Sequence, residues 1–274
     1  MTAKNSSPII TTIDIELFPI EAHVWKLFDN NVGLNQIQQD WTVMSFAAKR
    51  LDPKAPTRSL IARRRATDYM DVSAKADIRD DAELVQALWH ILHDSDVIIG
   101  HNMRRFDIRK IRARMLSLGM QPPSPCRVID TLELAKSAGA FTSNKLEYLS
   151  AELTEAKKST HKNYPGHSLW TACMAHDARA WAECKSYNIM DVLSTEELYL
   201  KLRPWATQAV NLATYIDPET VACPVCGSEH VAEDGYSFTN VSKYQRYHCQ
   251  ECGAWSRSRY SINSSATRKA LLSK

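Results

Sequence analysis

Residues 9–15 (IITTIDI) form an apolar run rich in β-branched side chains, which predicts a buried strand. Asp14 and Glu16 stand at positions i and i+2 of this run, so both carboxylates leave the same face of the strand. A solvated strand face is the ordinary explanation for such a pair. Because the neighbouring residues are isoleucine and leucine, simple solvation is hard to accept here. The chain is therefore expected to place two acids beside the core of a sheet.

The remainder of the first 200 residues alternates between strand and helix patterns. Further strands are expected at 22–28, 41–51, 59–64, 97–100 and 127–135. Helices are expected from Asp80 or Asp81, from about Asp107, at 145–153, and from Asp177 to about Leu202. Strands followed by βα units predict an α/β fold, a mixed sheet flanked by helices, in a domain over residues 1–210.

Composition and charge exclude several classes of protein. A chain with 44% hydrophobic and 24% charged residues is expected to be globular rather than disordered. The net charge of +3 does not by itself argue for a nucleic-acid partner. The N-terminal sequence MTAKNSSP lacks a secretory pattern, and no window approaches the roughly 18 apolar residues of a membrane span. We therefore expect a cytoplasmic protein without membrane contact.

Two further acids lie on predicted helices, one at the start of a helix and one within a helix. Asp107 ends the segment GHNMRRFD, in which Asn102 closes a strand and Phe106 is expected to anchor the next helix in the core. A helix N-cap is the competing explanation for this aspartate. Asp191 ends the segment YNIMD, one helical turn after Tyr187, and such a spacing is commonplace on helices.

In this order, the three segments resemble the exonuclease motifs of the DEDD superfamily: D-x-E, N-x-x-x-F-D and Y-x-x-x-D. The tyrosine marks the DEDDy branch, which includes the proofreading domain of family-B DNA polymerases, and the resemblance covers roughly residues 9–203. It implies an RNase H-like fold and release of nucleoside 5′-monophosphates from DNA 3′ ends. It also implies that Tyr187 positions the attacking water and that two Mg²⁺ or Mn²⁺ ions are held by Asp14, Glu16, Asp107 and Asp191.

The chemistry of such a site requires these residue types. Converging carboxylates repel one another unless cations neutralise them, and hard oxygen ligands select Mg²⁺ or Mn²⁺. Two such ions about 3.5–4 Å apart clamp an in-line displacement at phosphorus. Asp130, in RVIDTL, is a fifth acid near a strand end. We expect it to be a strand-end or capping residue, with a place in the site as the minority alternative.

The last part of the chain carries two matching C-x-x-C-G pairs. In a chain without an export signal, this pattern predicts a closed Cys₄ site for one structural Zn²⁺ rather than a disulfide framework. The expected ligands are Cys223, Cys226, Cys249 and Cys252. We predict a zinc ribbon over residues 216–262, with tight turns at Gly227 and Gly253, and a basic, flexible tail over 263–274.

Basic and aromatic residues near both sites predict contacts with nucleic acid. In the ribbon these are Tyr247, Trp255 and Arg257, for which protein docking or simple stabilisation is the alternative. Near the acids they are Asn102, Arg104, Arg105, Phe18 and Lys162. Phe18 directly follows the D-x-E segment and is expected either to wedge against a terminal base or, slightly preferred, to pack in the core.

The expected partners are single-stranded DNA or DNA 3′ ends, with RNA and a replication or repair protein as further candidates. Trimming of this kind suits repair, recombination or degradation in a bacterium or a phage-infected cell. An RNA exonuclease similar to RNase D shares the same motifs, and a structure-specific endonuclease is possible on the same fold. A binding protein without turnover is less favoured, because all four acids and the tyrosine are present.

Overall fold

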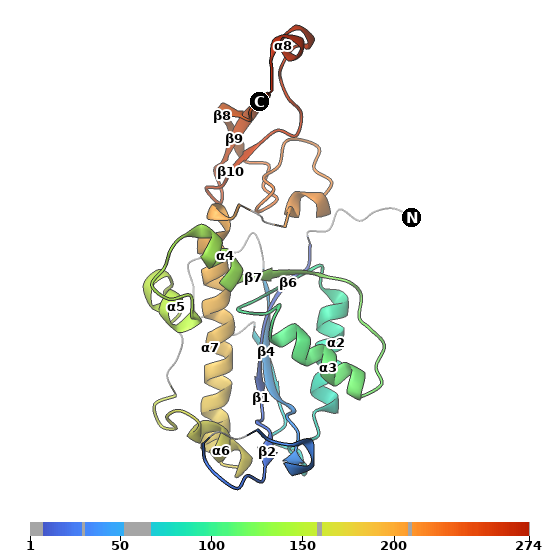
Figure 1. Ribbon diagram of the computed structural model, residues 1–274, viewed down its shortest axis with the longest axis vertical. Coiled ribbons are helices and arrows are strands. Elements are labelled where there is room, and N and C mark those ends of the chain that lie inside the picture. The colour runs from blue at the N-terminus through green and yellow to red at the C-terminus, as the bar shows by residue number, and fades with distance from the viewer. Residues whose placement is uncertain (1–7, 29–30, 52–66, 158–160, 208–209, 274) are drawn as a thin grey trace. The chain divides into compact units, whose positions relative to one another are not determined.

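The computed structural model describes residues 8–28, 31–51, 67–157, 161–207 and 210–273 (Figure 1). The chain divides into two compact units. The larger unit comprises Ile9–Glu133 and Phe141–Tyr199, and the smaller unit comprises Leu134–Ala140 and Leu200–Lys274. Among the described residues, no helix is long and apolar enough to span a membrane.

A five-stranded mixed sheet forms the centre of the larger unit, in the order β5-β4-β1-β6-β7. The strands are β1 (Ile10–Leu17), β4 (Val43–Leu51), β5 (Thr67–Asp71), β6 (Val97–Gly100) and β7 (Arg127–Asp130). β1 pairs antiparallel with β4 and parallel with β6, and β6 pairs parallel with β7. The prediction of an α/β fold with a mixed sheet is confirmed.

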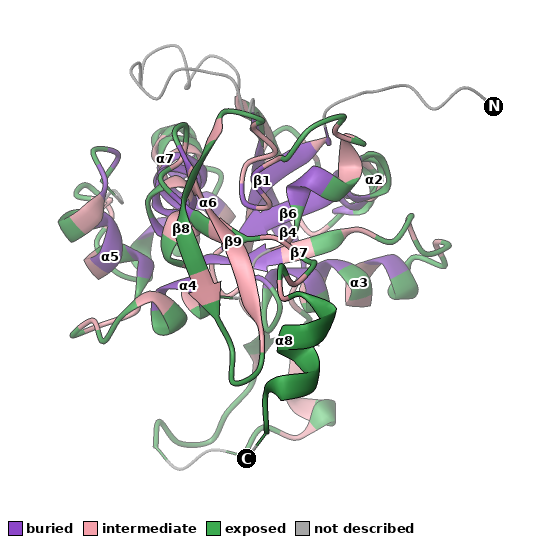
Figure 2. Ribbon diagram, turned by 90° about the horizontal axis from the view of Figure 1, so that it is seen from above, coloured by how far each residue is buried: buried purple, intermediate pink, exposed green. Residues whose placement is uncertain are grey.

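Helices cover both faces of this sheet (Figure 1). α2 (Ala82–Asp94) and α3 (Asp107–Ser117) lie on one face, and α7 (Ala178–Leu202) lies on the other. The shorter helices are α4 (Thr131–Ala138), α5 (Leu146–Leu153) and α6 (Ser168–Met174). Figure 2 shows that β1, β4 and β6, the three central strands of the sheet, are mostly buried. Their apolar side chains form one core with α2, α3 and α7, which fixes the positions of polar residues at the strand ends.

Several predicted elements differ from the structure. Residues 22–28 do not form a sheet strand, because β4 and β6 already occupy both edges of β1. Only Glu21–Ala22 (β2) is extended there, paired with Ile37–Gln39 (β3), and Trp25 is 98% exposed. The predicted strand 59–64 lies outside the described residues.

The strand predicted over 127–135 ends at Asp130, where helix α4 begins. The Asp130 carboxylate accepts a hydrogen bond from the backbone N–H of Leu132 (3.0 Å), as a helix-capping aspartate does. Helix α6 lies between the helices predicted at 145–153 and from Asp177, where the sequence predicts no element. Short 3₁₀ turns occur at Leu34–Gln36, Arg203–Trp205 and Leu212–Tyr215.

In the smaller unit, three antiparallel strands form a sheet in the order β10-β9-β8. They are β8 (Val231–Phe238), β9 (Lys243–Cys249) and β10 (Trp255–Arg257), and they lie within the segment 216–262, which is called the ribbon below. The tail predicted over 263–274 contains a short helix, α8 (Ser265–Ala270). The Ser264 hydroxyl accepts a hydrogen bond from the Thr267 N–H (3.0 Å) and caps this helix.

Candidate active site and metal clusters

Three of the four predicted acidic ligands converge in the larger unit. Asp14 and Glu16 project from β1, and Asp191 projects from α7. One carboxylate oxygen of each lies within 4.8 Å of the other two. Asp191 is buried and the other two acids are partly exposed, so the cluster opens to solvent on one side. Three carboxylates this close repel one another, and a hard divalent cation is the partner that relieves this repulsion.

Asp107, the fourth predicted ligand, begins helix α3 and is 5% exposed. The backbone N–H of Ile15, which lies between Asp14 and Glu16 on β1, donates a hydrogen bond to its carboxylate. Burial raises the pKa of Asp107 to about 7, two backbone N–H groups oppose this rise, and the nearby charge of Asp130 adds to it. Asp107 does not lie within 4.8 Å of all three other acids, so it borders their cluster.

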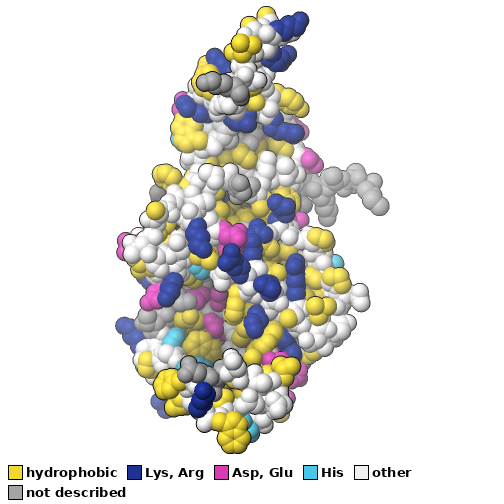
Figure 3. All heavy atoms as spheres, in the orientation of Figure 1, with side chains coloured by type: hydrophobic (Ala, Val, Ile, Leu, Met, Phe, Trp, Pro, Cys, Tyr) yellow, Lys and Arg dark blue, Asp and Glu magenta, His cyan; other side chains and the backbone are white. Residues whose placement is uncertain are grey.

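On the face drawn in Figure 3, acidic side chains gather in a hollow, with Lys and Arg side chains around it. All the donor atoms of the three clustered residues are carboxylate oxygens. Oxygen donors of this kind suit Mg²⁺ or Mn²⁺ and are poorly matched to soft, thiolate-seeking metals. The cluster therefore fits the hard cations that the sequence predicts.

Asn188 is a functional candidate that the sequence reasoning missed. Its side-chain amide donates to Asp14 Oδ2 (2.6 Å) and to the main-chain oxygen of Asp14 (3.2 Å). The Ser45 hydroxyl donates to Asn188 Oδ1 (3.3 Å), and Asn188 is fully buried. A residue three positions before Asp191 on a helix shares its face, so the segment YNIMD contained this signal. Asn188 fixes the orientation of one carboxylate of the cluster.

Tyr187 lies on α7, one turn before Asp191, and is 8% exposed. The ring of His161 packs edge-on against its ring, with the centroids 5.3 Å apart. The His161 side chain is itself held by a contact between Nδ1 and the Tyr164 carbonyl oxygen (2.6 Å). The segment before α6 therefore reaches the tyrosine of the third motif.

The turn between β6 and α3 is held by Asp130. Its carboxylate accepts the backbone N–H groups of Asn102 (2.9 Å) and Arg104 (3.1 Å). Asn102 has φ of +59°, in the left-handed region that asparagine tolerates better than most residues. Asp130 thus serves as the strand-end and capping residue that the sequence favoured, and it lies outside the three-acid cluster.

Phe106 does not anchor helix α3 in the core, contrary to the prediction. It is 43% exposed, whereas Met103 is fully buried and packs close to Gly100. Phe106 instead lines an open cavity of about 420 Å³ that begins at Leu17, directly after Glu16. Its other walls include Ile20, Trp41, Lys110, His167 and Trp170. The Lys110 ammonium lies 3.8 Å from the Trp41 ring centroid, so the cavity offers aromatic surface and a positive charge.

A family model described as the RNase_H superfamily matches residues 48–203, more than half of the chain. The chain belongs to the RNase H superfamily. The matched segment includes Asp107, Tyr187 and Asp191 and begins after Asp14 and Glu16. The place of these two earlier acids in the site therefore rests on the geometry described above.

Among solved structures, this RNase H superfamily protein is similar to the family B DNA polymerase from the hyperthermophilic archaeon Pyrobaculum calidifontis. The likeness has 15% sequence identity and a TM-score of 0.47, and it covers 76% of this chain and 28% of the polymerase. This level of likeness does not bear on activity. None of the curated proteins compared with the chain matches it.

The predicted nucleic-acid contacts near the acids have different surroundings. Arg104 forms an ion pair with Glu133 (Nε to Oε2, 3.0 Å), and its guanidinium also donates to the Val128 carbonyl oxygen. Its charge is therefore already paired. Arg105 and Lys162 are exposed.

Phe18 is a correction to the predicted contacts. The structure buries it completely, with its ring edge-on to the Trp181 ring at a centroid distance of 6.0 Å. A ring with no exposed surface cannot stack on a base. The alternative role, packing in the core, is the one observed.

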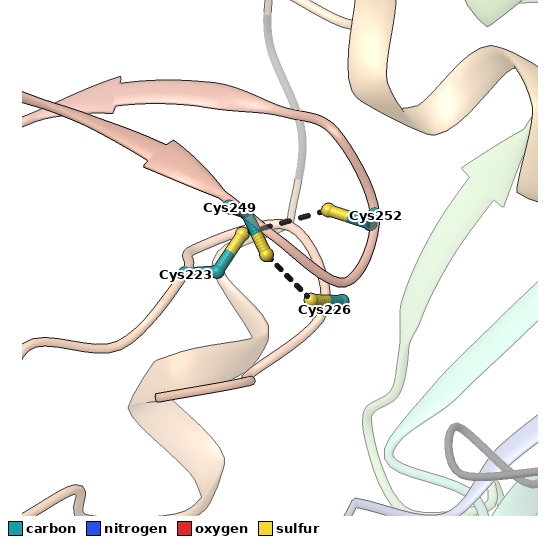
Figure 4. A group of neighbouring side chains, drawn as sticks. All are labelled: Cys223, Cys226, Cys249 and Cys252. Carbon is teal, nitrogen blue, oxygen red and sulfur yellow. Dashed lines mark hydrogen bonds between the residues drawn. The ribbon is translucent and has the colours of Figure 1, made fainter. Parts of the chain in front are cut away.

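The four predicted cysteine ligands converge in the smaller unit (Figure 4). The Sγ atoms of Cys223 and Cys252 are 3.7 Å apart, and those of Cys226 and Cys249 are 3.6 Å apart. A tetrahedral Zn²⁺ with Zn–S bonds of about 2.3 Å has sulfur–sulfur edges of about 3.8 Å. The cluster therefore already has nearly the size that zinc requires, and it leaves no ligand position open.

The turns around these cysteines have the conformation that the glycines predict. Gly227 and Gly253 each have φ of +77°, a conformation that residues with a side chain rarely adopt. Hydrogen bonds from Cys226 and Cys252 and from backbone N–H groups lower the pKa of Cys223, while its thiol partners raise that of Cys226. The lowered pKa of Cys223 favours its thiolate, the form in which cysteine binds metal.

Tyr247, Trp255 and Arg257 do not share one surface of the ribbon. Trp255 pairs with His248 and Arg257 pairs with Arg246 across the β9–β10 ladder. Since successive side chains alternate between the faces of a strand, Tyr247 lies on the opposite face from Trp255 and Arg257. The structure therefore separates one member of the predicted set from the other two.

Proposed function

We propose that this protein is a metal-dependent 3′–5′ exonuclease of the DEDDy type that releases nucleoside 5′-monophosphates from DNA 3′ ends. The observation that carries the proposal is the convergence of Asp14, Glu16 and Asp191 within 4.8 Å of one another. Asp107 supports it, because its carboxylate is hydrogen-bonded to the backbone between the two β1 acids. A purely structural role would not gather this many acids beside a core.

Two Mg²⁺ or Mn²⁺ ions held by the four acids would supply an activated water and stabilise the leaving 3′-oxygen. The protein's own groups prepare this chemistry. Asn188 holds the Asp14 carboxylate in one orientation, which lowers the cost of organising the site. The Tyr187 hydroxyl orients the attacking water by a hydrogen bond. The aromatic cavity beyond Leu17 receives the sugar and base of the nucleotide being released.

A time course with 5′-labelled oligonucleotides tests this proposal. Matched single-stranded and double-stranded DNA and RNA are incubated in Mg²⁺, beside the Asp191→Ala variant. We expect a ladder that shortens from the 3′ end, 5′-mononucleotide products, faster degradation of DNA than of RNA, and no degradation by the variant. Faster loss of RNA would redirect the proposal to an RNase D-like activity.

Two further results would contradict the proposal. Cleavage of a circular single strand would identify an endonuclease. Equal degradation by the native protein and Asp191→Ala would mean that the acids do not carry the activity. Mn²⁺ binding measured by calorimetry without substrate provides a separate test, because it must weaken in the variant whatever the substrate is.

A further inference from the structure

One face of the ribbon carries a continuous row of cationic and aromatic side chains. On β9, every second residue points to this face, namely Tyr244, Arg246 and His248. The register of the β9–β10 ladder adds Trp255 opposite His248 and Arg257 opposite Arg246. These five residues are called the stacked face below. Trp255 is 51% exposed and Arg257 is exposed, so the row is accessible to a partner.

The side chains of the stacked face are packed plane against plane. The Trp255 and His248 rings stack with centroids 4.4 Å apart, and the Arg246 guanidinium lies over the Trp255 ring at 4.7 Å. The Arg257 guanidinium lies over the Tyr244 ring at 3.8 Å. Because stacking holds both guanidiniums in place, binding a ligand costs little further side-chain entropy.

The positive charges of the stacked face favour binding of an anion. Arg246 and Arg257 stand directly opposite each other on neighbouring strands, and like charges in this relation destabilise a sheet. Asp234 offsets part of the repulsion through an exposed ion pair with Arg246 (3.3 Å). Within the described part of the chain, no carboxylate lies within ion-pair distance of Arg257, whose guanidinium donates to the Ser258 carbonyl oxygen at 3.4 Å.

We infer that the stacked face binds single-stranded DNA, with phosphates on Arg246 and Arg257 and bases against the exposed part of Trp255. Guanidiniums interleaved with aromatic rings match a ligand that alternates phosphate charge with flat bases. A protein partner would instead favour a wide apolar patch, whereas this face is cationic. The inference goes beyond the proposed exonuclease activity and does not depend on turnover.

The opposite face of the ribbon offers a matched control. Tyr236 is 44% exposed there, and the Lys243 ammonium lies 3.5 Å from its ring centroid. This pair has the same chemistry, an aromatic ring under a cation, in the same three-stranded sheet. It lacks the second cation and the neighbouring stacked rings of the other face.

The test measures binding of the full chain, carrying Asp191→Asn to prevent degradation, to fluorescein-labelled dT20 by anisotropy across a salt series. Trp255→Ala is expected to weaken binding by about 5- to 100-fold. Arg257→Gln is expected to lower the slope of log Kd against log salt by about 0.7. Tyr236→Ala is expected to leave Kd within about twofold, since it removes surface that the ligand does not touch.

Zinc content is measured for each variant, because a ribbon that loses its metal would weaken binding indirectly. Arg257→Gln, at an exposed position, keeps the inference testable if Trp255→Ala loses zinc. Unchanged affinity and unchanged salt slope in a zinc-loaded Arg257→Gln variant would overturn the inference and leave a protein partner as the alternative. Equal weakening by Tyr236→Ala would overturn the assignment to this face. Tighter binding of rU20 than of dT20 would overturn the assignment to DNA.

Discussion

The molecule contains two clusters of metal-binding side chains, and they are built in opposite ways. The cysteine cluster takes its four ligands from two short turns, each of which places two sulfurs by local backbone geometry. The acid cluster takes its ligands from β1 and α7, which are more than 150 residues apart along the chain. The first therefore organises its own surroundings, whereas the second exists only where the core is already folded.

The two clusters also differ in what a metal would add. Four thiolates around one zinc leave no position for substrate, so the metal contributes to folding alone. The acid cluster is partly exposed and leaves room for water and phosphate oxygens, so its cations would contribute to chemistry. The comparison predicts that metal loss unfolds the ribbon but leaves the larger unit folded and inactive.

Cys226→Ser should have the largest effect on stability. Structural zinc contributes an apparent free energy on the order of 10 kcal/mol to small zinc modules, so the ribbon should unfold without its fourth ligand. We expect zinc content to fall from about one ion per chain to none, and the ribbon amides to lose protection from hydrogen exchange. Amides in the core of the larger unit should remain protected. Normal zinc content in this variant would contradict the prediction that the cysteine cluster is a structural zinc site that needs all four ligands.

Asp191→Ala should abolish catalysis without unfolding the protein. Loss of a ligand to a catalytic cation should lower the rate by about three orders of magnitude or more. The free energy of unfolding should change little or rise, because the substitution relieves repulsion among three close carboxylates. Rates and thermal unfolding are measured on the same preparation, with Glu152→Ala on the exposed side of α5 as control. A large loss of stability alongside the loss of activity would mean that Asp191 is primarily structural.

Asn188→Ala should lower the metal affinity of the acid cluster, with a smaller loss of activity than Asp191→Ala causes. Partners that orient metal ligands typically contribute 10- to 100-fold in metal affinity or activity, and Asn188 supplies two hydrogen bonds to Asp14. The apparent affinity for Mn²⁺ should fall by roughly this factor, and saturating Mn²⁺ should restore most of the rate. A variant with normal Mn²⁺ affinity and a low rate would show that Asn188 acts on something other than the metal.

Residues with distinctive spacing could be predicted from the sequence, and residues defined by packing could not. The sequence predicts the three acids that converge and the four cysteines, because the chemistry and order of these residues are restrictive. Met103, rather than Phe106, anchors the turn before α3: Met103 is fully buried and packs tightly against Gly100, whereas Phe106 is 43% exposed. The spacing of residues in the sequence does not predict which of two neighbouring apolar side chains is buried.

The alternation of basic and aromatic residues in the ribbon was visible in the sequence, but their division between two faces was not. Strand register decides which residues share a face, and β9 and β10 are joined by a metal-binding turn rather than a standard hairpin. Residues 22–28 carry enough apolar side chains to suggest a strand. Their exposure follows from the sheet, in which both edges of β1 are already taken.

Tyr187→Phe should have the smallest effect on the rate, and it separates the role of the tyrosine from that of the metal-binding acids. The substitution removes one hydroxyl and retains the ring that packs against His161, so the fold around α7 should persist. If the hydroxyl only orients water, the loss of about one hydrogen bond should slow the reaction about tenfold, with Mn²⁺ affinity unchanged. Single-turnover rates with excess protein separate this chemical step from product release. A loss as large as that of Asp191→Ala would assign the tyrosine a role in the chemical step itself, because orienting a water molecule cannot account for three orders of magnitude.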